Sequence, residues 1–334
     1  MVGAADRGWG GPPRRILGRM SHLRHPAGPR TLRAVVLGDL ALDVVLAPAR
    51  PLEHGTDVPG AVRLHQGGSA ANTARWLARL GVRSTLVCSV GRDAPGRALV
   101  EALRRGGVTV RAARPAGART ARIGMVVDAV GERSFVADRG AADLLAPDNL
   151  RPAWFRGAGV LHLPGYSLLG SPLGEAAARA VVLAREAGAR VAVDLASAAP
   201  LLAHGRPAAH VLVRGVTADL LFTNAAEASA FLGDADVALL LDFAPIAVVK
   251  RAAGGATLLA RSSAGPAIRL EVVTRAVAAA DTTGAGDAFD AGFLAAWLAA
   301  GRATTPAALR RAVVAGHRVA ARQIAVARPE LALG

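Results

Sequence analysis

Residues 281–290 combine residue types that could bind an anion and move a proton. They read Asp-Thr-Thr-Gly-Ala-Gly-Asp-Ala-Phe-Asp and open an apolar, Ala-rich run. A helix starting here would present unpaired N–H groups at the positive end of its dipole, and glycines would let an anion approach them. The carboxylate of Asp287 would repel that anion, but it could take a proton from a hydroxyl that attacks a phosphoryl group. An ordinary capped helix start is the alternative interpretation.

A second glycine motif precedes another predicted helix. Residues 66–74 read Gln-Gly-Gly-Ser-Ala-Ala-Asn-Thr-Ala. Gly67 and Gly68 would allow a ligand to lie against the backbone. Asn72, one turn into the helix, could bind hydroxyls with both its amide oxygen and its NH2 group. Alternatively, Asn72 is a buried residue of a packed helix start.

In this order, the two motifs resemble those of the PfkB, or ribokinase-like, carbohydrate kinase family. The first is similar to the family's GG…N signature, and the second is similar to DTxGAGD almost residue for residue. The resemblance extends from about residue 33 to about residue 328. It implies an α/β fold, a ribokinase-like three-layer sandwich with a mostly parallel central sheet and a small β-strand lid.

The resemblance also implies a reaction, in which the γ-phosphoryl group of Mg-ATP passes to a hydroxyl of a small carbohydrate. Asp287 would be the base, and the turn of Gly284, Ala285 and Gly286 would bind the transferring anion. The residues implied to contact the sugar are Asp43, Gly67, Gly68, Asn72 and Arg139. Those implied near ATP and Mg2+ are Asn224, Glu227, Lys250, Gly255 and Thr283, with Glu227 acting on the metal indirectly. Several relatives hold a monovalent cation, which implies a K+ site at Asp281.

Two departures from ribokinases bear on the acceptor. Ala41 stands where ribokinases tend to carry Asn, and residues 161–165 lack the Glu found on the corresponding strand. Ribose is therefore disfavoured, and fructose, a keto-deoxy sugar acid that Arg139 would meet, and a nucleoside all stay open. A nucleoside kinase and a catalytically silent sugar-binding regulator are the alternative functions. The resemblance also allows a homodimer formed through the lid.

Strand-like and helix-like runs alternate along the chain. We predict buried strands at 34–38, 84–90, 158–163, 190–195, 219–223 and 246–250. We predict helices at 70–80, 94–105, 173–187, 224–232, 284–299 and 305–323. Such alternation is typical of parallel βαβ units with helices on both sheet faces. Residues 44–66 and 120–138 break the rhythm and are assigned to the lid, within a kinase domain of residues 31–330.

Composition excludes several other classes of protein. The net charge of +15 comes almost entirely from scattered arginines, and aromatic residues make up only 4% of the chain. A stacking platform for nucleic acid is therefore not expected. The chain also lacks the Gly-Lys-Ser/Thr of a P-loop, since Lys250 is its only lysine.

The expected setting is cytoplasmic. The single cysteine, Cys88, cannot form an internal disulfide and lies in an apolar run. No apolar run is long enough for a transmembrane helix, so no membrane partner is expected. Residues 1–30 are rich in Gly, Pro and Arg and are predicted to form a disordered basic tail.

Overall fold

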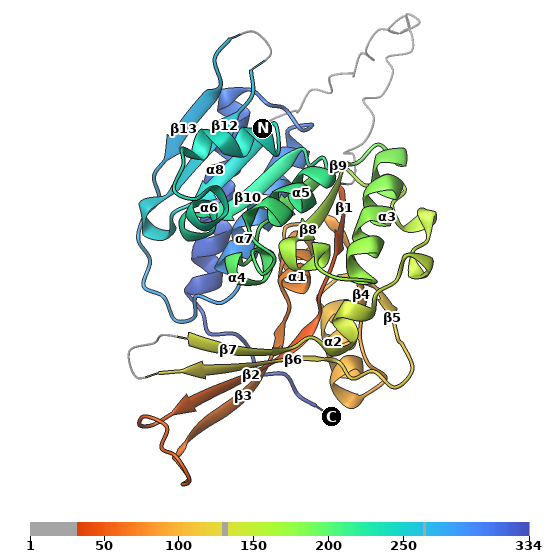
Figure 1. Ribbon diagram of the computed structural model, residues 1–334, viewed down its shortest axis with the longest axis vertical. Helices are drawn as coiled ribbons and strands as arrows, with labels where there is room; N and C mark the ends of the chain where they lie inside the picture. The colour runs from red at the N-terminus through yellow and green to blue at the C-terminus, as the bar shows by residue number, and fades with distance from the viewer. Residues whose placement is uncertain (1–31, 129–132, 263–264, 334) are drawn as a thin grey trace, which may run out of the picture. The chain divides into compact units, whose positions relative to one another are not determined.

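Strands in the described residues form two sheets (Figure 1). The computed structural model describes residues 32–128, 133–262 and 265–333, which belong to one compact unit, Thr31–Gly334. The predicted basic tail lies outside the described residues. The strands are β1 (Arg33–Leu37), β2 (Ala41–Pro48), β3 (Gly60–Gly67), β4 (Arg83–Ser89), β5 (Thr109–Ala113), β6 (Ala121–Val127), β7 (Arg133–Asp138), β8 (Val160–Pro164), β9 (Arg190–Asp194), β10 (Leu220–Asn224), β11 (Ile246–Lys250), β12 (Ala256–Ala260) and β13 (Ile268–Val272).

The larger sheet has the order β13-β12-β11-β10-β9-β8-β1-β4-β5 in the described chain. All its pairings are parallel except β11 with β12 and β12 with β13. The helices are α1 (Ser69–Arg79), α2 (Ala94–Arg105), α3 (Leu173–Glu186), α4 (Ala198–Leu201), α5 (Arg206–Gly215), α6 (Ala225–Leu232), α7 (Ala285–Ala299) and α8 (Pro306–Ile324). Short 3-10 helices span Gly140–Leu144, Pro147–Asn149, Pro152–Trp154, Gly165–Leu168, Val237–Asp242 and Ala252–Gly254.

Helices cover both faces of this sheet, because successive side chains of its strands point to opposite sides. In β1, Ala34 and Val36 belong to a cluster with α1, α2, α7 and α8, whereas Val35 and Leu37 belong to a cluster with α3, α5 and α6. The expected three-layer α/β architecture with a mostly parallel sheet is therefore confirmed. No helix in the described residues is both long and apolar enough to span a bilayer.

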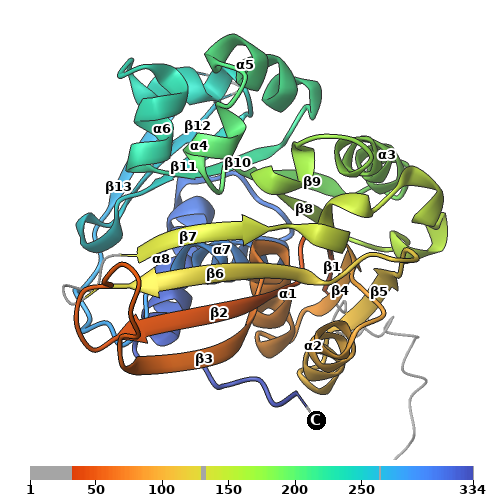
Figure 2. The ribbon, with the colours of Figure 1, turned by 60° about the horizontal axis from the view of Figure 1, so that its bottom comes forward.

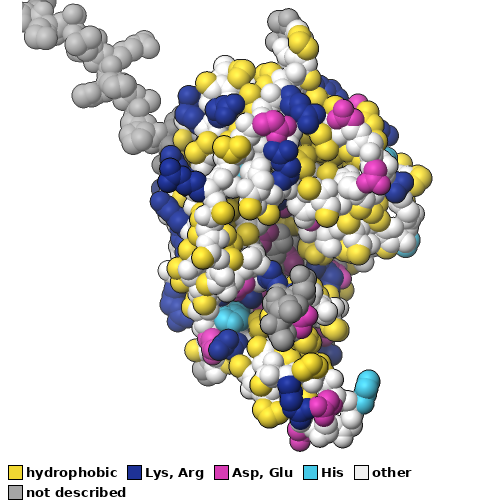
Figure 3. Space-filling view, turned by 90° about the vertical axis from the view of Figure 1, so that its left-hand side faces the viewer, with side chains coloured by type: hydrophobic (Ala, Val, Ile, Leu, Met, Phe, Trp, Pro, Cys, Tyr) yellow, Lys and Arg dark blue, Asp and Glu magenta, His cyan; other side chains and the backbone are white. Residues whose placement is uncertain are grey.

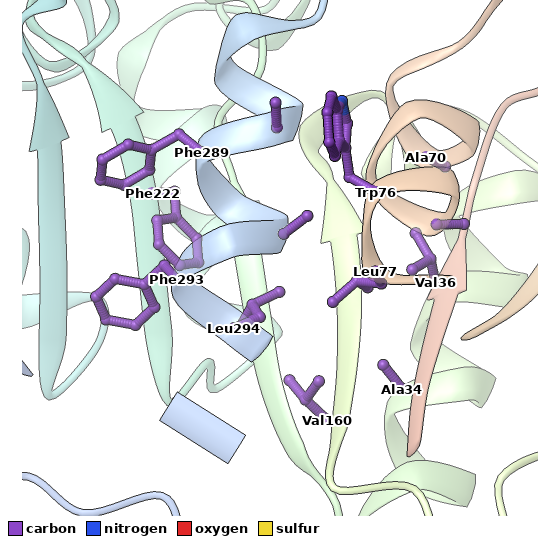
Figure 4. Close-up of a cluster of buried hydrophobic side chains, with 14 of the residues drawn as sticks. Ala34, Val36, Ala70, Trp76, Leu77, Val160, Phe222, Phe289, Phe293 and Leu294 are labelled. Carbon is purple, nitrogen blue, oxygen red and sulfur yellow. The ribbon is translucent and has the colours of Figure 1, made fainter. Parts of the chain in front are cut away.

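The first cluster fixes α7, the helix that follows the Gly-rich turn. Trp76 and Leu77 of α1 lie on one side of α7, and Phe222 lies on the other side against Phe293 (Figure 4). The rings of Phe222 and Phe293 meet edge to face at 5.2 Å. Burial of this kind is the main favourable term in folding, so the position of the turn depends on the core.

The smaller sheet forms the lid, with the order β3-β2-β6-β7 (Figure 2). Strand β2 pairs antiparallel with β3 and parallel with β6, and β6 pairs antiparallel with β7. The two segments that break the strand–helix rhythm in the sequence thus form one sheet. Ile123, Met125 and Phe135 of this sheet line the large cleft described below.

Candidate active site

The two glycine motifs meet at one end of a cleft of about 1420 Å³. Each motif begins a helix, α1 after Gly68 and α7 after Gly284, and both glycines have positive φ angles, of 97° and 75°. Figure 3 shows the surface hollowed between the lid and the body that holds the larger sheet, with side chains of both charges visible there. Of the predicted site residues, all line this cleft except Gly67 and Asp281.

Asp287 lies at the centre of the meeting point. Its carboxylate accepts hydrogen bonds from the Ser69 hydroxyl and, at 2.9 Å, from Nδ2 of Asn72. Burial raises the pKa of Asp287 to about 7, against the two hydrogen bonds, which lower it. A base with a pKa near neutrality suits proton transfer at physiological pH. Gln66 in turn donates to Oδ1 of Asn72 at 3.2 Å, so this amide is held as a support for Asp287.

This environment predicts the pH dependence of catalysis. Asp287 must be deprotonated to act as a base, so kcat/KM should fall about tenfold for each pH unit below about 7 and level off above it. Ser69→Ala removes a hydrogen bond that lowers the pKa of Asp287, so its acidic limb should move to higher pH. Ser84→Ala, which removes a buried hydroxyl from strand β4, is the control and should leave the limb in place. If Ser69→Ala left the acidic limb at its native pH, the limb would not report the titration of Asp287.

The turn before α7 supplies backbone donors. The first intrahelical bond runs from the N–H of Ala288 to Gly284 O, at 2.9 Å, and Ala285 N already donates to Thr282 O at 3.3 Å. Helix geometry leaves the N–H groups of Gly286 and Asp287 without intrahelical acceptors. The Gln323 side chain holds the turn from α8, because it donates to Thr283 O at 3.0 Å and accepts from Trp76 at 2.8 Å.

The sole lysine lies directly beneath this turn. A Cβ added at Gly286 would be 3.4 Å from Nζ of Lys250. The ammonium pairs with Asp194 at 2.9 Å and with Asp290 at 3.1 Å. Burial opposes its charge, but these two carboxylates raise the pKa of Lys250 above its usual range. Burial would also raise the pKa of Asp194, yet Lys250 lowers it, whereas burial and the nearby Asp194 raise that of Asp290. A fixed positive charge therefore lies close to Gly286 at the start of α7.

Asn224 and Glu227 form the start of helix α6 and also line the cleft. The Asn224 side chain accepts from the N–H of Glu227 at 2.8 Å, and the Glu227 carboxylate accepts from the N–H of Asn224 at 2.9 Å. This reciprocal pair is a capping box, which accounts for one oxygen of each side chain. Gly255, just before strand β12, also lines the cleft. Its φ is 86°, and any side chain there would overlap the carbonyl of Val272.

Two of the predicted sugar residues come from the lid side of the cleft, Asp43 in strand β2 and Arg139 directly after strand β7. Asp43 of β2 is buried beside Gly67, where any side chain would overlap its carboxylate. Burial raises the pKa of Asp43, partly offset by Arg328. Arg139 lies near Asp39 at 3.6 Å, bonds Asp143 at 2.6 Å and stacks on Tyr166. Its Nη2 has no hydrogen-bond partner in the described chain.

Sequence reasoning missed Arg328, Ser69 and the acidic partners of Lys250. Arg328 follows α8 and has only 4% of its side chain exposed. It pairs with both Asp43 and Asp281. The sequence around Arg328, which lies between an Ala-rich helix and a proline, does not indicate a site residue, because the partners of Arg328 are distant in sequence. Ser69 belongs to the first motif, but its hydrogen bond to Asp287 becomes visible only in the folded structure.

Comparison with known proteins identifies the family of the chain. Residues 31–329 match the family described as pfkB family carbohydrate kinase. The chain is 32% identical over 273 residues to the ATP-dependent ribose-1-phosphate kinase of Halopiger xanaduensis, covering 81% of this chain and 86% of that protein. It is 29% identical to mouse ribokinase over 279 residues, covering 79% and 81%. The structure of fructokinase with bound ATP from Xylella fastidiosa superposes with a TM-score of 0.77 at 24% identity, over 89% of this chain and 93% of that one. This chain therefore belongs to the PfkB family of carbohydrate kinases and is a phosphotransferase.

Proposed function

We propose that this protein transfers the γ-phosphoryl group of ATP to a hydroxyl of a small carbohydrate, with Asp287 as the base. The observation that carries the proposal is the position of the Asp287 carboxylate. It is held by Ser69 and Asn72, has a pKa of about 7 and lies one residue after Gly286, whose N–H has no intrahelical acceptor. A base and an anion site at such close range suit direct transfer.

The step needs no covalent enzyme intermediate. Asp287 takes the proton of the acceptor hydroxyl while that oxygen bonds to the γ-phosphorus. The bond from phosphorus to the bridging oxygen breaks, and ADP leaves with the bond's electron pair. The N–H groups of Gly286 and Asp287 and the ammonium of Lys250 would stabilise the negative charge that develops on the transferring group. We expect the lid residues Ile123, Met125 and Phe135, which line the cleft, to limit access of water, a competing acceptor.

The nucleotide would lie on the side of the cleft opposite the lid, along Asn224, Glu227 and Lys250. The described residues contain no group of three or more His, Cys, Asp or Glu side chains arranged to hold a metal. This fits Mg2+, which commonly keeps several waters and is bound through one or two carboxylates together with nucleotide phosphates. Glu227 would hold such a metal indirectly. When bound, Mg2+ neutralises charge on the phosphate oxygens.

The acceptor would bind between Asp43, Asn72 and Arg139. The free Nη2 of Arg139 is a donor that an acceptor oxygen could satisfy, which favours acceptors with a carboxylate or several hydroxyls. We test this with a screen of ADP formation over ribose, ribose 1-phosphate, fructose, keto-deoxy sugar acids and nucleosides. Acceptor-dependent ADP formation with a sugar is the expected result. Activity restricted to nucleosides would favour the nucleoside kinase instead.

Asp43→Asn tests the assignment of the sugar side. The substitution keeps the size of the side chain and removes its charge, so acceptor hydroxyls lose a strong partner. We expect the acceptor KM to rise, or kcat to fall, by about tenfold, with nucleotide affinity nearly unchanged. Separate titrations of acceptor and ATP measure the two effects. Asp57→Asn, in the exposed loop after β2, is the control. A selective loss of ATP binding would show that the two ends of the site are reversed.

The dimer through the lid is also proposed. Leu46, Val62 and Val136 are exposed apolar residues on lid strands, with Val62 at 66% and Val136 at 76% exposure, and a second copy would cover them. Light scattering should give twice the chain mass for the native protein and a lower mass for Val136→Asp. A native protein of single-chain mass at micromolar concentration would rule this out.

A further inference from the structure

One buried guanidinium joins the two halves of the candidate site. Nη1 of Arg328 donates to Oδ2 of Asp43 at 2.6 Å, and its Nε donates to Oδ2 of Asp281 at 2.8 Å. Asp43 belongs to the lid strand β2, whereas Asp281 opens the stretch that leads into the turn before α7. Burial would lower the pKa of Arg328, but the two carboxylates raise it, so the charge is firmly held.

Asp281 is already surrounded by donors. Its Oδ1 accepts from the N–H of Thr283 at 2.8 Å and lies 3.8 Å from Nη1 of Arg133, while Arg328 occupies Oδ2. Burial would raise the pKa of Asp281, but the Thr283 N–H and Arg328 lower it. Each oxygen of this carboxylate therefore lies near a guanidinium group, Oδ1 near that of Arg133 and Oδ2 near that of Arg328.

A monovalent cation does not fit this environment. A K+ ion beside Asp281 would need oxygen ligands that are free to face it, and it would lie next to two guanidinium groups of the same charge. The Thr283 hydroxyl, a candidate ligand, already accepts from Nη1 of Arg133 at 2.6 Å. The K+ site implied by the resemblance to relatives is therefore at odds with the residues around Asp281.

We propose that Arg328 is an internal substitute for a monovalent cation, which orients Asp281 before the catalytic turn and Asp43 at the acceptor side. The proposal rests on the proposed function for its kinetic part. Arg328 is a positioning residue, because it acts through these two carboxylates. Phosphoryl transfer should then proceed without any added monovalent cation.

The segment after α8 is anchored so that the guanidinium stays in place. Leu331 N donates to Leu64 O of β3 at 2.7 Å, and the Nδ1 of His65 lies at hydrogen-bonding distance, 3.0 Å, from Pro329 O. Arg63 of the same strand pairs with Glu330 at 3.3 Å on the exposed side. The lid strand β3 thus holds the three residues that follow Arg328, and Arg328 links the lid to the turn.

The first experiment compares K+, Na+ and choline chlorides at equal ionic strength. For the native protein we expect the same Tm, and kcat/KM equal within about twofold, in all three salts. The Tm readout needs no activity, so it separates this proposal from the proposed function. A native kcat/KM that rises severalfold in K+ alone would overturn the proposal. A native Tm that rises by several degrees in K+ alone would also overturn it. Absence of ADP formation with every acceptor, together with a salt-independent Tm, would overturn the proposed function only.

The second experiment removes the guanidinium. Arg328→Ala should lower kcat/KM by about tenfold or more, through poor positioning of two carboxylates. Added guanidinium ion or K+ should restore part of that activity and raise the Tm of this variant, but choline should not. Arg63→Ala is the matched control, since it loosens the same segment without touching Asp43 or Asp281, and it should gain nothing from guanidinium.

Arg328→Lys covers the case in which the alanine variant fails to fold. Its ammonium keeps the charge but cannot bridge two carboxylates with a planar fork. We expect a folded protein with reduced kcat/KM and still no K+ requirement. Full activity of Arg328→Ala in choline, or the same guanidinium rescue in Arg63→Ala, would show that Arg328 merely packs the segment.

Discussion

Asp287→Asn is expected to lower kcat by about 10²–10⁴, the range for loss of a general base. The substitution keeps the shape of the side chain and its place at the start of α7. It removes the carboxylate that accepts hydrogen bonds from Ser69 and Asn72 and that can take a proton. ATP affinity should barely change, because the backbone N–H groups stay. Steady-state ADP formation and a nucleotide titration measure the two quantities.

Asp148→Asn is the control for this change. It is the same substitution at an exposed position far along the chain from the Gly-rich turn, and it should keep native rates. An Asp287→Asn variant with more than half of the native kcat would end the assignment of Asp287 as the base.

Gly286→Val is expected to lower kcat by about 10²–10³ or more. Loss of one donor to a developing negative charge already costs this much. The new side chain would start 3.4 Å from Nζ of Lys250, in the space that the transferring group would share with that ammonium. Measured kcat and ATP affinity should fall together, because the added methyl groups exclude the phosphate.

Gly215→Val is the matched control for the glycine change. Gly215 ends helix α5, has no atom within 4 Å of an added Cβ and is exposed. The same two methyl groups should therefore leave kcat and Tm close to native values. Normal turnover by Gly286→Val would mean that the phosphoryl group does not pass this turn.

The sequence predicted those parts of the site that depend on local backbone form. Glycines 68 and 284 precede helices α1 and α7, as their pattern predicted, and the structure gives both glycines positive φ angles. The pattern also predicted an anion site beside Asp287, which stays a prediction. It could not show that Asn72 supports Asp287, because that contact spans 215 residues. A motif gives residue types, and only the packing of α1 against α7 sets their partners.

Charged partners were the least predictable part. Lys250 was placed near the nucleotide, but its pairing with Asp194 and Asp290 depends on the order of strands in the sheet and on α7. Arg328 was missed for the same reason, since its two carboxylates come from β2 and from the loop before α7. Among many scattered arginines, nothing local marks the buried one.

The regular elements followed from periodicity where the signal was long and apolar. Strands β1, β4, β8, β9, β10 and β11 and helices α1, α2, α3, α6, α7 and α8 lie where they were predicted. The edge strands β5 and β13, strand β12 beside β13, and helices α4 and α5 were not predicted. Strands β5 and β13 alternate buried with exposed residues over only five positions, which is too short for a clear pattern. Strand β12 is buried throughout but equally short.

A single-turnover experiment with γ-labelled ATP tests the central claim most directly. With enzyme in excess and the best acceptor from the screen, the native protein should move the label into that acceptor, and the rate should fall below pH 7 with the titration of Asp287. In Asp287→Asn, ATP should bind while the label stays in ATP over the same period. Transfer to the acceptor at the native rate in Asp287→Asn, or label that stays on the protein, would contradict direct transfer with Asp287 as the base.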